Sequence, residues 1–561
     1  MLTGQDVKNQ VSIASKGYRF VDDVVGGADP NSTNGQHLLT PQPGEASIID
    51  PRGPDTRHRA GNSADPIRTF GQILLDTLHV ENPSPTRWPA FEELTEQQYL
   101  IILDHYKWRL MQAVPFALLP PDIQPGDKNP ILLLSILLTA SSSFRDFQYQ
   151  ADEVFRHVLA DQVIIKGQRS LDLLQGLLTY LTWYHHHFDP ETQQFYQLLQ
   201  LATAMAADLG LPKKFAGDDN NALQTPPIQT VEDPIRNELR AFLLCYYLNC
   251  GAAVLGYDRP ENMHCIRSLR QAAQLLAQSP TEPHDVESPA LVELLYVAAQ
   301  HRVSINNLEN SEIPISQMQV CWDSETALKS WAEKYLHEGT PCVLRSSYNY
   351  ISTYRILKPA NIGVGGRLTP ASLEDIATCI AICQAQLSNI SQQDPSYLVE
   401  FSVLEWAPVM TYLFILPRLE AAIGSTTTTA SAASAASGVT PSADRYGSHN
   451  RTSCALKMVE QFRSQLAKLK AHAETDTMLN AHRFFAVLDQ ILPAVERRAI
   501  PMALQNGAPS LQISQSTAVD GGGSAYELVN SYTDDDDYQP RERTASLDRV
   551  WVDFMSDWVQ W

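Results

Sequence analysis

Three consecutive histidines, His185, His186 and His187, are the side-chain group in this sequence that most suggests a metal site. Imidazole is a common zinc ligand, and a protein site places three or four ligands around one ion. Successive helix positions point about 100° apart, so three neighbours cannot face one ion unless the helix has ended. We therefore expect no metal here, but a helix end with one buried and two solvated histidines.

The eight cysteines form no CxxC pair, and their spacing favours packing over chemistry. Cys379 and Cys383 lie one helical turn apart and could share a metal, but the nearby sequence supplies no further ligand. His264-Cys265 places a thiol beside a base, although sequence neighbours rarely form a nucleophile pair. We expect the 379/383 pair to act as small buried hydrophobic residues, and we predict no metal and no cofactor.

Two acidic runs and one glycine-rich segment have the composition of enzyme sites without the required setting. Asp218-Asp219 lies in a polar loop and Asp534 to Asp537 in a low-complexity tract, whereas magnesium-dependent helical enzymes hold the ion on core helices. The segment 363–366 lacks the third glycine and the preceding strand of a dinucleotide-binding loop. The motifs GxSxG and HExxH and the protein-kinase set are absent. The sequence therefore predicts that the protein is not an enzyme.

Aromatic and acidic residues alternate in the C-terminal segment, 541–561. Its apolar residues recur at helical spacing, which predicts an amphipathic helix. Such acidic-hydrophobic alternation is typical of activation segments that fold on a partner. Two interpretations stay open, because the helix can instead dock onto the protein's own core. The partner interpretation uses Trp551, Phe554, Trp558, Asp553 and Asp557.

Helix signals fill the chain between its low-complexity tracts. The segment 170–187 has a narrow polar stripe on an otherwise apolar surface, which predicts a helix surrounded by others, with Ser170 as its N-cap. Further helices are expected to start at Asp233-Pro234, Ser288-Pro289 and Thr369-Pro370. Only 162–166 and 342–357 have strand-like composition, so the predicted fold class is all-α, a large helical domain.

Composition sets the outer limits of function. The chain has 561 residues, 44% of them hydrophobic, and a formal net charge of -21. An acidic chain binds nucleic acid only through a compact basic module, and none is present. The apolar stretches 131–140 and 241–256 are too short to span a bilayer, and the first residues do not form a signal peptide. We expect a soluble intracellular protein that does not bind membranes.

We expect six segments along the chain. A disordered N-terminal segment, 1–65, precedes the first part of the helical domain, 66–423. A low-complexity linker, 424–452, separates this part from a helical continuation of the same domain, 453–505. A disordered acidic tract, 506–540, leads to the C-terminal helix, 541–561.

The stretch 129–211 resembles the middle region of fungal zinc-cluster transcription factors, the fungal-specific transcription factor domain. The phrases that carry the resemblance are NPILLLSILLTAS, SLDLLQ, WYH and DLGL, and the helix 240–248 followed by Arg259-Pro260 fits the next element. The resemblance extends over about residues 90 to 500 and is specific only from 129 to 260. It implies an all-α regulatory domain, a nuclear location, and control of genes in secondary-metabolite or nutrient pathways.

Members of that family carry an N-terminal six-cysteine zinc cluster that binds DNA. The first cysteine here is Cys245, so no zinc ligand or DNA-contacting residue carries over. We expect a nuclear transcriptional regulator that reaches DNA indirectly, through the transcription machinery or a zinc-cluster relative, as a homo- or heterodimer, or whose zinc-cluster exon lies upstream. The alternatives are a helical enzyme or small-molecule-binding protein of such a pathway, and an inactive gene copy.

Overall fold

Helices form all the regular secondary structure that the computed structural model describes. The described residues are 68–80, 87–118, 129–188, 193–216, 233–254, 262–310, 317–360, 373–436, 454–475 and 479–499. No strand occurs in these ranges, which confirms the all-α prediction. The strand-like stretch 162–166 ends a π-helical turn, and 342–357 lies inside a long helix. None of the described helices is long and apolar enough to cross a membrane.

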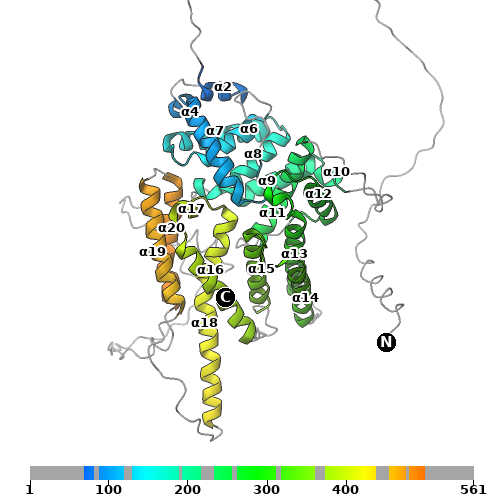
Figure 1. Cartoon of the computed structure of the whole chain (residues 1–561), viewed down its shortest axis with the longest axis vertical. Helices are drawn as coiled ribbons and strands as arrows, with labels where there is room; N and C mark the ends of the chain where they lie inside the picture. Colours follow the sequence, from blue (N-terminus) through cyan, green and yellow to red (C-terminus); the bar gives the residue numbers. More distant parts are fainter. Residues whose placement is uncertain are drawn as a thin grey trace, which may run out of the picture. The chain divides into compact units, whose positions relative to one another are not determined.

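The N-terminal half begins with short helices (Figure 1). Its elements are α2 (Phe70–Thr77), α3 (Pro89–Glu92), α4 (Glu96–His105), the π-helix η1 (Tyr106–Leu110), α5 (Met111–Ala113), α6 (Pro130–Ala140), α7 (Arg145–Leu159), the π-helix η2 (Ala160–Ile165), α8 (Leu171–Thr182), the 3-10 helix η3 (Tyr184–His187), α9 (Phe195–Asp208), α10 (Leu211–Lys214), α11 (Asp233–Val254) and α12 (Ile266–Gln278).

The contact between α6 and α8 involves one carboxylate and one glycine. Ser170 caps α8 as predicted, because its side chain accepts a hydrogen bond from the Leu173 amide. Asp172 reaches α6 instead, and its two oxygens accept hydrogen bonds from the amides of Ile131 and Leu132, at 3.0 and 2.8 Å. Gly176 touches Ile131 so closely that a Cβ would lie 2.9 Å from the Ile131 carbonyl oxygen. The backbones of the two helices are therefore in close contact at Gly176 and Ile131.

The C-terminal half places long helices beside one another (Figure 1). Its elements are the 3-10 helix η4 (Pro283–Asp285), α13 (Ser288–Asn310), α14 (Gln317–Tyr335), α15 (Cys342–Ala360), α16 (Leu373–Gln392), α17 (Pro395–Leu398), α18 (Val403–Ala436), α19 (Cys454–Thr475) and α20 (Leu479–Ala499). α13, α15, α16 and α18 contact one another in that order, and α11 packs on α13.

Several helix ends match the sequence signals and one does not. α11 and α13 begin at Asp233 and Ser288, where the Pro-containing signals predicted them. α9 ends before Gly210, whose φ of 72° is a left-handed conformation that glycine adopts without strain. α9 begins at Phe195, and the Asp189-Pro190-Glu191 segment before it lies outside the described residues. α18 continues through the expected domain boundary at residue 423.

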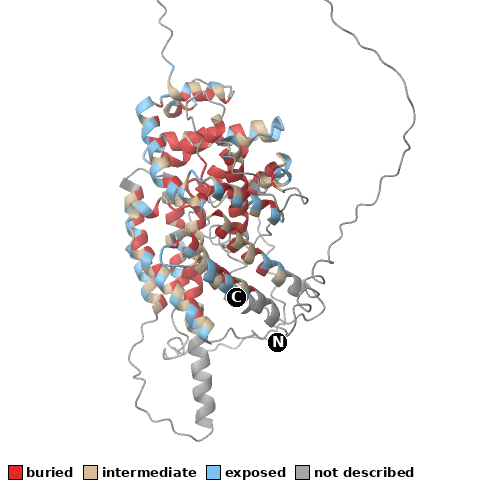
Figure 2. Cartoon of the chain, turned by 45° about the vertical axis from the view of Figure 1, so that its right-hand side comes forward, coloured by how far each residue is buried: buried red, intermediate tan, exposed pale blue. Residues whose placement is uncertain are grey.

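The hydrophobic core is continuous from α2 to α20. Every residue of α6 from Ile131 to Ala140 and of α11 from Leu239 to Ala252 is buried, whereas helices such as α7 and α12 bury one face and expose the other (Figure 2). α20 packs on η3, so the last described helix covers the middle of the chain. The described helices on both sides of the 424–452 segment thus belong to one core.

Candidate functional site

A cavity of about 330 Å³ lies among the C-terminal helices. Cavities of roughly 300 to 1,000 Å³ with apolar walls and a few polar groups are typical small-molecule sites. The walls come from α11, α13, α15, α16 and α18, with α5, η4 and α17 at the edges. Its lining residues include Tyr247, His284, Tyr350, Tyr397, Phe401, Glu405 and Tyr412.

Aromatic rings form much of the cavity wall. Tyr350 of α15 and Tyr412 of α18 are both buried, with ring centroids 6.0 Å apart. The Tyr350 hydroxyl lies 3.4 Å from the Thr411 hydroxyl. Tyr397 and Phe401 meet edge to face at 5.3 Å. Burial raises the pKa of Tyr247 and of Tyr412, so these phenols stay neutral and can both donate and accept hydrogen bonds.

Glu405 brings a carboxylate to this wall. It is the third residue of α18, and its Oε2 accepts a hydrogen bond from the Ser402 amide at 2.7 Å. This contact is half of a capping box, which explains why the chain can place a glutamate at a buried helix start. Burial raises the pKa of Glu405 to about 7, and the hydrogen bonds from Ser402 oppose that rise.

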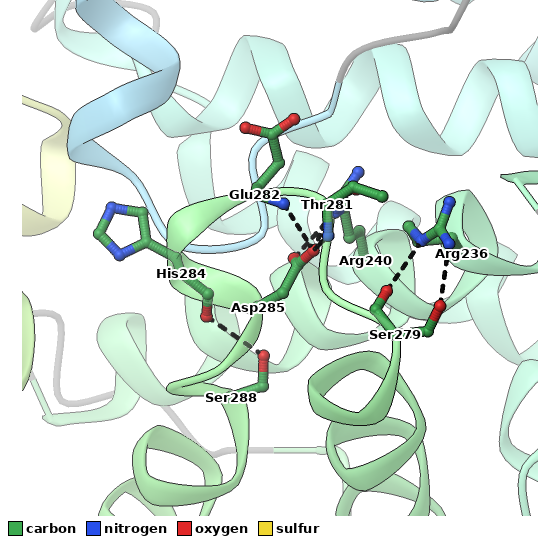
Figure 3. Close-up of polar contacts among 8 residues, drawn as sticks. All are labelled: Arg236, Arg240, Ser279, Thr281, Glu282, His284, Asp285 and Ser288. Atoms are coloured by element: carbon green, nitrogen blue, oxygen red, sulfur yellow. Dashed lines mark hydrogen bonds and ion pairs between the residues drawn. The ribbon is translucent and has the colours of Figure 1, made fainter. Parts of the chain in front are cut away.

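His284 lies at another edge of the cavity, in η4, where its surroundings are fixed by polar contacts (Figure 3). Its Nε2 is 2.8 Å from the Gln112 carbonyl oxygen, and its Nδ1 is 3.1 Å from the Glu287 carboxylate. The next residue, Asp285, forms a buried bidentate pair with Arg240 of α11, at 2.6 and 3.1 Å. This pair ties α11 to η4 and so holds His284 in place.

The connector between α17 and α18 is anchored to the N-terminal half. The Trp183 indole donates to the Glu400 carbonyl oxygen at 3.2 Å, and the Arg109 Nε is 3.1 Å from the Glu400 carboxylate. His186 Nε2 is 3.2 Å from the Val399 carbonyl oxygen. Because Phe401 and Glu405 follow this connector directly, contacts with both halves of the core position the cavity wall.

The expectation of one buried and two solvated histidines at the end of α8 is wrong, because all three are buried. The helix ends at Thr182 and η3 continues under α20, where His185 lies against Phe484 at a centroid distance of 5.4 Å. His187 stacks on Tyr180, and its Nδ1 is 3.7 Å from Asp152, too far for a hydrogen bond. Among the described residues, no group of three or more His, Cys, Asp or Glu could hold a metal ion.

The other candidates from the sequence divide into buried residues and residues that the structure does not describe. Cys379 and Cys383 are fully buried, as predicted, and burial raises the pKa of the Cys379 thiol to about 12. Asp218-Asp219, 363–366 and Asp534 to Asp537 lie outside the described residues, as do the tail residues Trp551, Asp553, Phe554, Asp557 and Trp558. The partner role of the tail stays a prediction.

Sequence reasoning missed the cavity. Its lining residues come from separate helices between Gln112 and Tyr412, and no motif joins them. One local signal was present, because Ser402 and Glu405 have the spacing of a capping box. That signal predicts a helix start. The carboxylate faces a cavity only because α18 packs on α16, and because α11, α13 and α15 supply the other walls.

These features define an all-α protein with an aromatic cavity in its C-terminal half. Curated proteins similar to this chain are named as transcription factors. Transcription factor himD of Aspergillus japonicus is 29% identical over 147 residues, 24% of each chain. Transcription factor opdL of Penicillium oxalicum is 26% identical over 204 residues, 34% of this chain and 35% of the relative. A transcription factor of Aspergillus terreus is 21% identical over 346 residues, 54% of this chain and 56% of the relative.

The chain therefore spans between 24% and 56% of the length of these curated relatives. No known family model matches the sequence. No solved structure is significantly similar to it. The chain is therefore similar to fungal proteins that are named transcription factors. The cavity is observed in this chain and does not come from the comparison.

Proposed function

We propose that this protein is a nuclear transcriptional regulator built from the helical middle domain of fungal zinc-cluster factors. The observation that supports this most is its similarity to three fungal proteins that are each named a transcription factor. The third of these alignments extends over 346 residues, which is longer than the segment 129–260 where the resemblance to the fungal transcription factor domain is specific. The all-α core agrees with that domain type.

Under this proposal the protein reaches DNA through a partner. No cysteine precedes Cys245, so this sequence offers no ligands for an N-terminal zinc cluster. The net charge of -21 makes direct electrostatic attraction to phosphates unfavourable. A zinc-cluster relative would supply the DNA contact, and the chain would act as a homo- or heterodimer that controls a secondary-metabolite or nutrient pathway. In this arrangement the protein is a regulator and not an enzyme.

Deletion of the gene, combined with a tagged copy, tests the regulatory role. We expect the tagged protein in the nucleus and a change in the transcripts of one gene group on deletion. A tagged protein that stays outside the nucleus, together with unchanged transcripts, would contradict the proposal.

The tail provides a second test, which separates partner recruitment from docking onto the core. In the double variant W551A/W558A the aromatic stripe is removed, whereas D553N/D557N keeps the stripe and removes charge. If the tail recruits a partner, W551A/W558A reproduces the transcript change seen on deletion, while the thermal stability of the purified protein is unaltered. If the tail docks on the core, the same variant lowers the melting temperature.

The alternative, a helical enzyme or small-molecule-binding protein of such a pathway, is favoured by one observation, the cavity of about 330 Å³. Binding and regulation are compatible in one chain, whereas catalysis requires turnover. Conversion of a pathway intermediate by the purified chain would favour the enzyme.

A further inference from the structure

The cavity has an unequal distribution of charge. Among the described residues that line it there is one carboxylate, Glu405, and no lysine or arginine. The nearest imidazole, His284, already has a carboxylate beside it, because its Nδ1 is 3.1 Å from Glu287. One Glu405 oxygen, Oε2, is used by the Ser402 amide. Among the described residues no lysine, arginine or histidine forms an ion pair with Glu405, and the electrostatic contribution of His284, which lowers the pKa of Glu405, is smaller than those of burial and of the Ser402 hydrogen bonds.

An ionised carboxylate in such a place is costly unless a positive group accompanies it. The raised pKa of Glu405 expresses this cost, since burial disfavours its charged form. A ligand that brings an ammonium group into the cavity would offset the cost, and it would also form a charge-assisted hydrogen bond. A ligand carboxylate would add a second negative charge and would be repelled.

The remaining walls suit the same kind of ligand. Tyr247, Tyr350, Tyr397 and Tyr412 come from four different helices, and an alkylammonium group is attracted to the faces of such rings. The volume, about 330 Å³, is roughly twice that of an engineered cavity that binds benzene. A fused aromatic ring with a short side chain is therefore of suitable size.

We propose that this cavity binds a small, mostly apolar amine in its protonated form, with the Glu405 carboxylate as counter-charge and the tyrosines as walls. This site is distinct from the transcriptional role, because it requires only the folded chain. Its test is a binding measurement on the purified protein, so it can fail while regulation stands, and the reverse.

Three molecules with the same ring and different charges make the test specific. Tryptamine is a cation, tryptophol is its neutral alcohol counterpart, and indole-3-acetate is an anion. Isothermal titration calorimetry with the full-length protein near neutral pH gives the three affinities. We expect tryptamine to bind most tightly, tryptophol more weakly and indole-3-acetate most weakly.

The capping box provides a matched variant. Glutamine can also accept the Ser402 amide hydrogen bond, so Glu405→Gln removes the charge and keeps the helix start. We expect Glu405→Gln to weaken tryptamine binding by about tenfold or more, while tryptophol changes by less than about twofold. Ser402→Ala is the structural control, since it alters the cap but keeps the carboxylate, and it should leave the preference for tryptamine in place.

The results divide clearly. The expected order of affinities, with a selective loss in Glu405→Gln, supports the proposal. It is overturned if tryptamine does not bind at about 1 mM, if indole-3-acetate binds as tightly as tryptamine, or if Glu405→Gln affects all three molecules alike. A melting curve of Glu405→Gln establishes that the variant is folded before it is titrated.

Discussion

His301 is a buried histidine whose surroundings disfavour its charged form. It lies on α13 with 3% of its surface exposed, and its ring packs edge to face on Tyr354 at 6.0 Å. Neither ring nitrogen has a hydrogen-bond partner among the described residues. Burial, with a smaller contribution from Arg355, lowers its pKa from 6.5 to about 4. His185, His186 and His187 are also buried, and their pKa values are lowered for the same main reason.

Because the pKa of His301 is lowered, we expect this residue to reduce the stability of the fold as the pH falls. At His301 the unfolded chain takes up a proton at a higher pH than the folded chain. The contribution of this residue to the free energy of unfolding is therefore fully present above about pH 6.5, and it is lost as the pH falls from about 6.5 to 4. His301→Phe removes this titration and fills the same space. At about pH 5.5 we expect the variant to be about 1 kcal/mol more stable, relative to wild type, than at about pH 7.5. Urea unfolding at both pH values measures the difference.

The comparison isolates one residue because other groups titrate equally in both proteins. Glu405 and Asp172 have pKa values raised to about 7 and about 6, so acidification stabilises the fold through them. A pH-independent difference between His301→Phe and wild type would show that His301 does not cause the acid sensitivity.

The buried pair of Arg240 and Asp285 makes a second prediction at this scale (Figure 3). Both side chains are at most 5% exposed, and Asp285 also accepts hydrogen bonds from the amides of Thr281 and Glu282. Arg240→Met leaves a buried carboxylate without its cation, so we expect a loss of about 3 to 5 kcal/mol in the free energy of unfolding. Chemical denaturation measures this loss.

The double variant R240M/D285N is the control for this pair. It removes both charges, so we expect it to recover part of the stability lost in Arg240→Met. A double variant as unstable as the sum of the two single variants would mean that the two side chains are not coupled.

At the scale of elements, the contact of α6 with α8 depends on Gly176. A Cβ there would lie 2.8 Å from Ile131 Cγ2 and 2.9 Å from its carbonyl oxygen, and α6 is buried from Ile131 to Ala140. Helix propensity alone predicts that Gly176→Ala stabilises α8 by up to about 1 kcal/mol. Because the methyl group forces the helices apart, we expect instead a loss of about 1 to 3 kcal/mol, measured by thermal or urea unfolding.

The sign of this result is decisive. A more stable Gly176→Ala would show that the two helices separate without cost. Gly210→Ala is a useful comparison, because Gly210 has open space around its Cα and only its positive φ opposes a side chain. We expect a smaller loss there, from backbone strain alone.

Helix starts were predictable where the signal is local. The Ser170 cap and the Pro-containing starts at Asp233 and Ser288 depend on contacts within one turn. The start of α9 at Phe195 has no such local signal, since Gln194 at its N-cap position makes no side-chain cap hydrogen bond and the Phe195 ring is buried against Tyr184. Packing of a buried ring can set a helix start where a cap, worth about 1 kcal/mol, is missing.

At the scale of the whole molecule, helices from both sides of the 424–452 segment share one core. α20 covers η3 through Phe484, whose ring lies 5.4 Å from His185 and 6.0 Å from Phe188. Phe485 packs on Trp406 of α18 at 5.7 Å. The C-terminal helices α19 and α20 therefore complete the fold, although low-complexity sequence precedes them.

This shared core predicts that the chain stays assembled when it is cut. A protease site inserted between residues 437 and 450 allows cleavage after folding. We expect the two fragments to elute together in size-exclusion chromatography, because the contacts of α20 with η3 and α18 remain. Phe485→Ala removes a fully buried ring and should weaken the association by about 3 to 5 kcal/mol. Fragments that separate without any substitution would contradict a single core.

The sequence by itself determined the helical fold class, several helix boundaries and the burial of the Cys379 and Cys383 pair, because these follow from hydrophobic period and local capping. Only the tertiary structure decided that His185 to His187 are all buried, that Asp172 caps a different helix, and that Glu405 faces an aromatic cavity. The physical reason is distance along the chain. A cap or a helix face is set by neighbours within one or two turns, whereas a cavity wall depends on where helices far apart in the sequence pack.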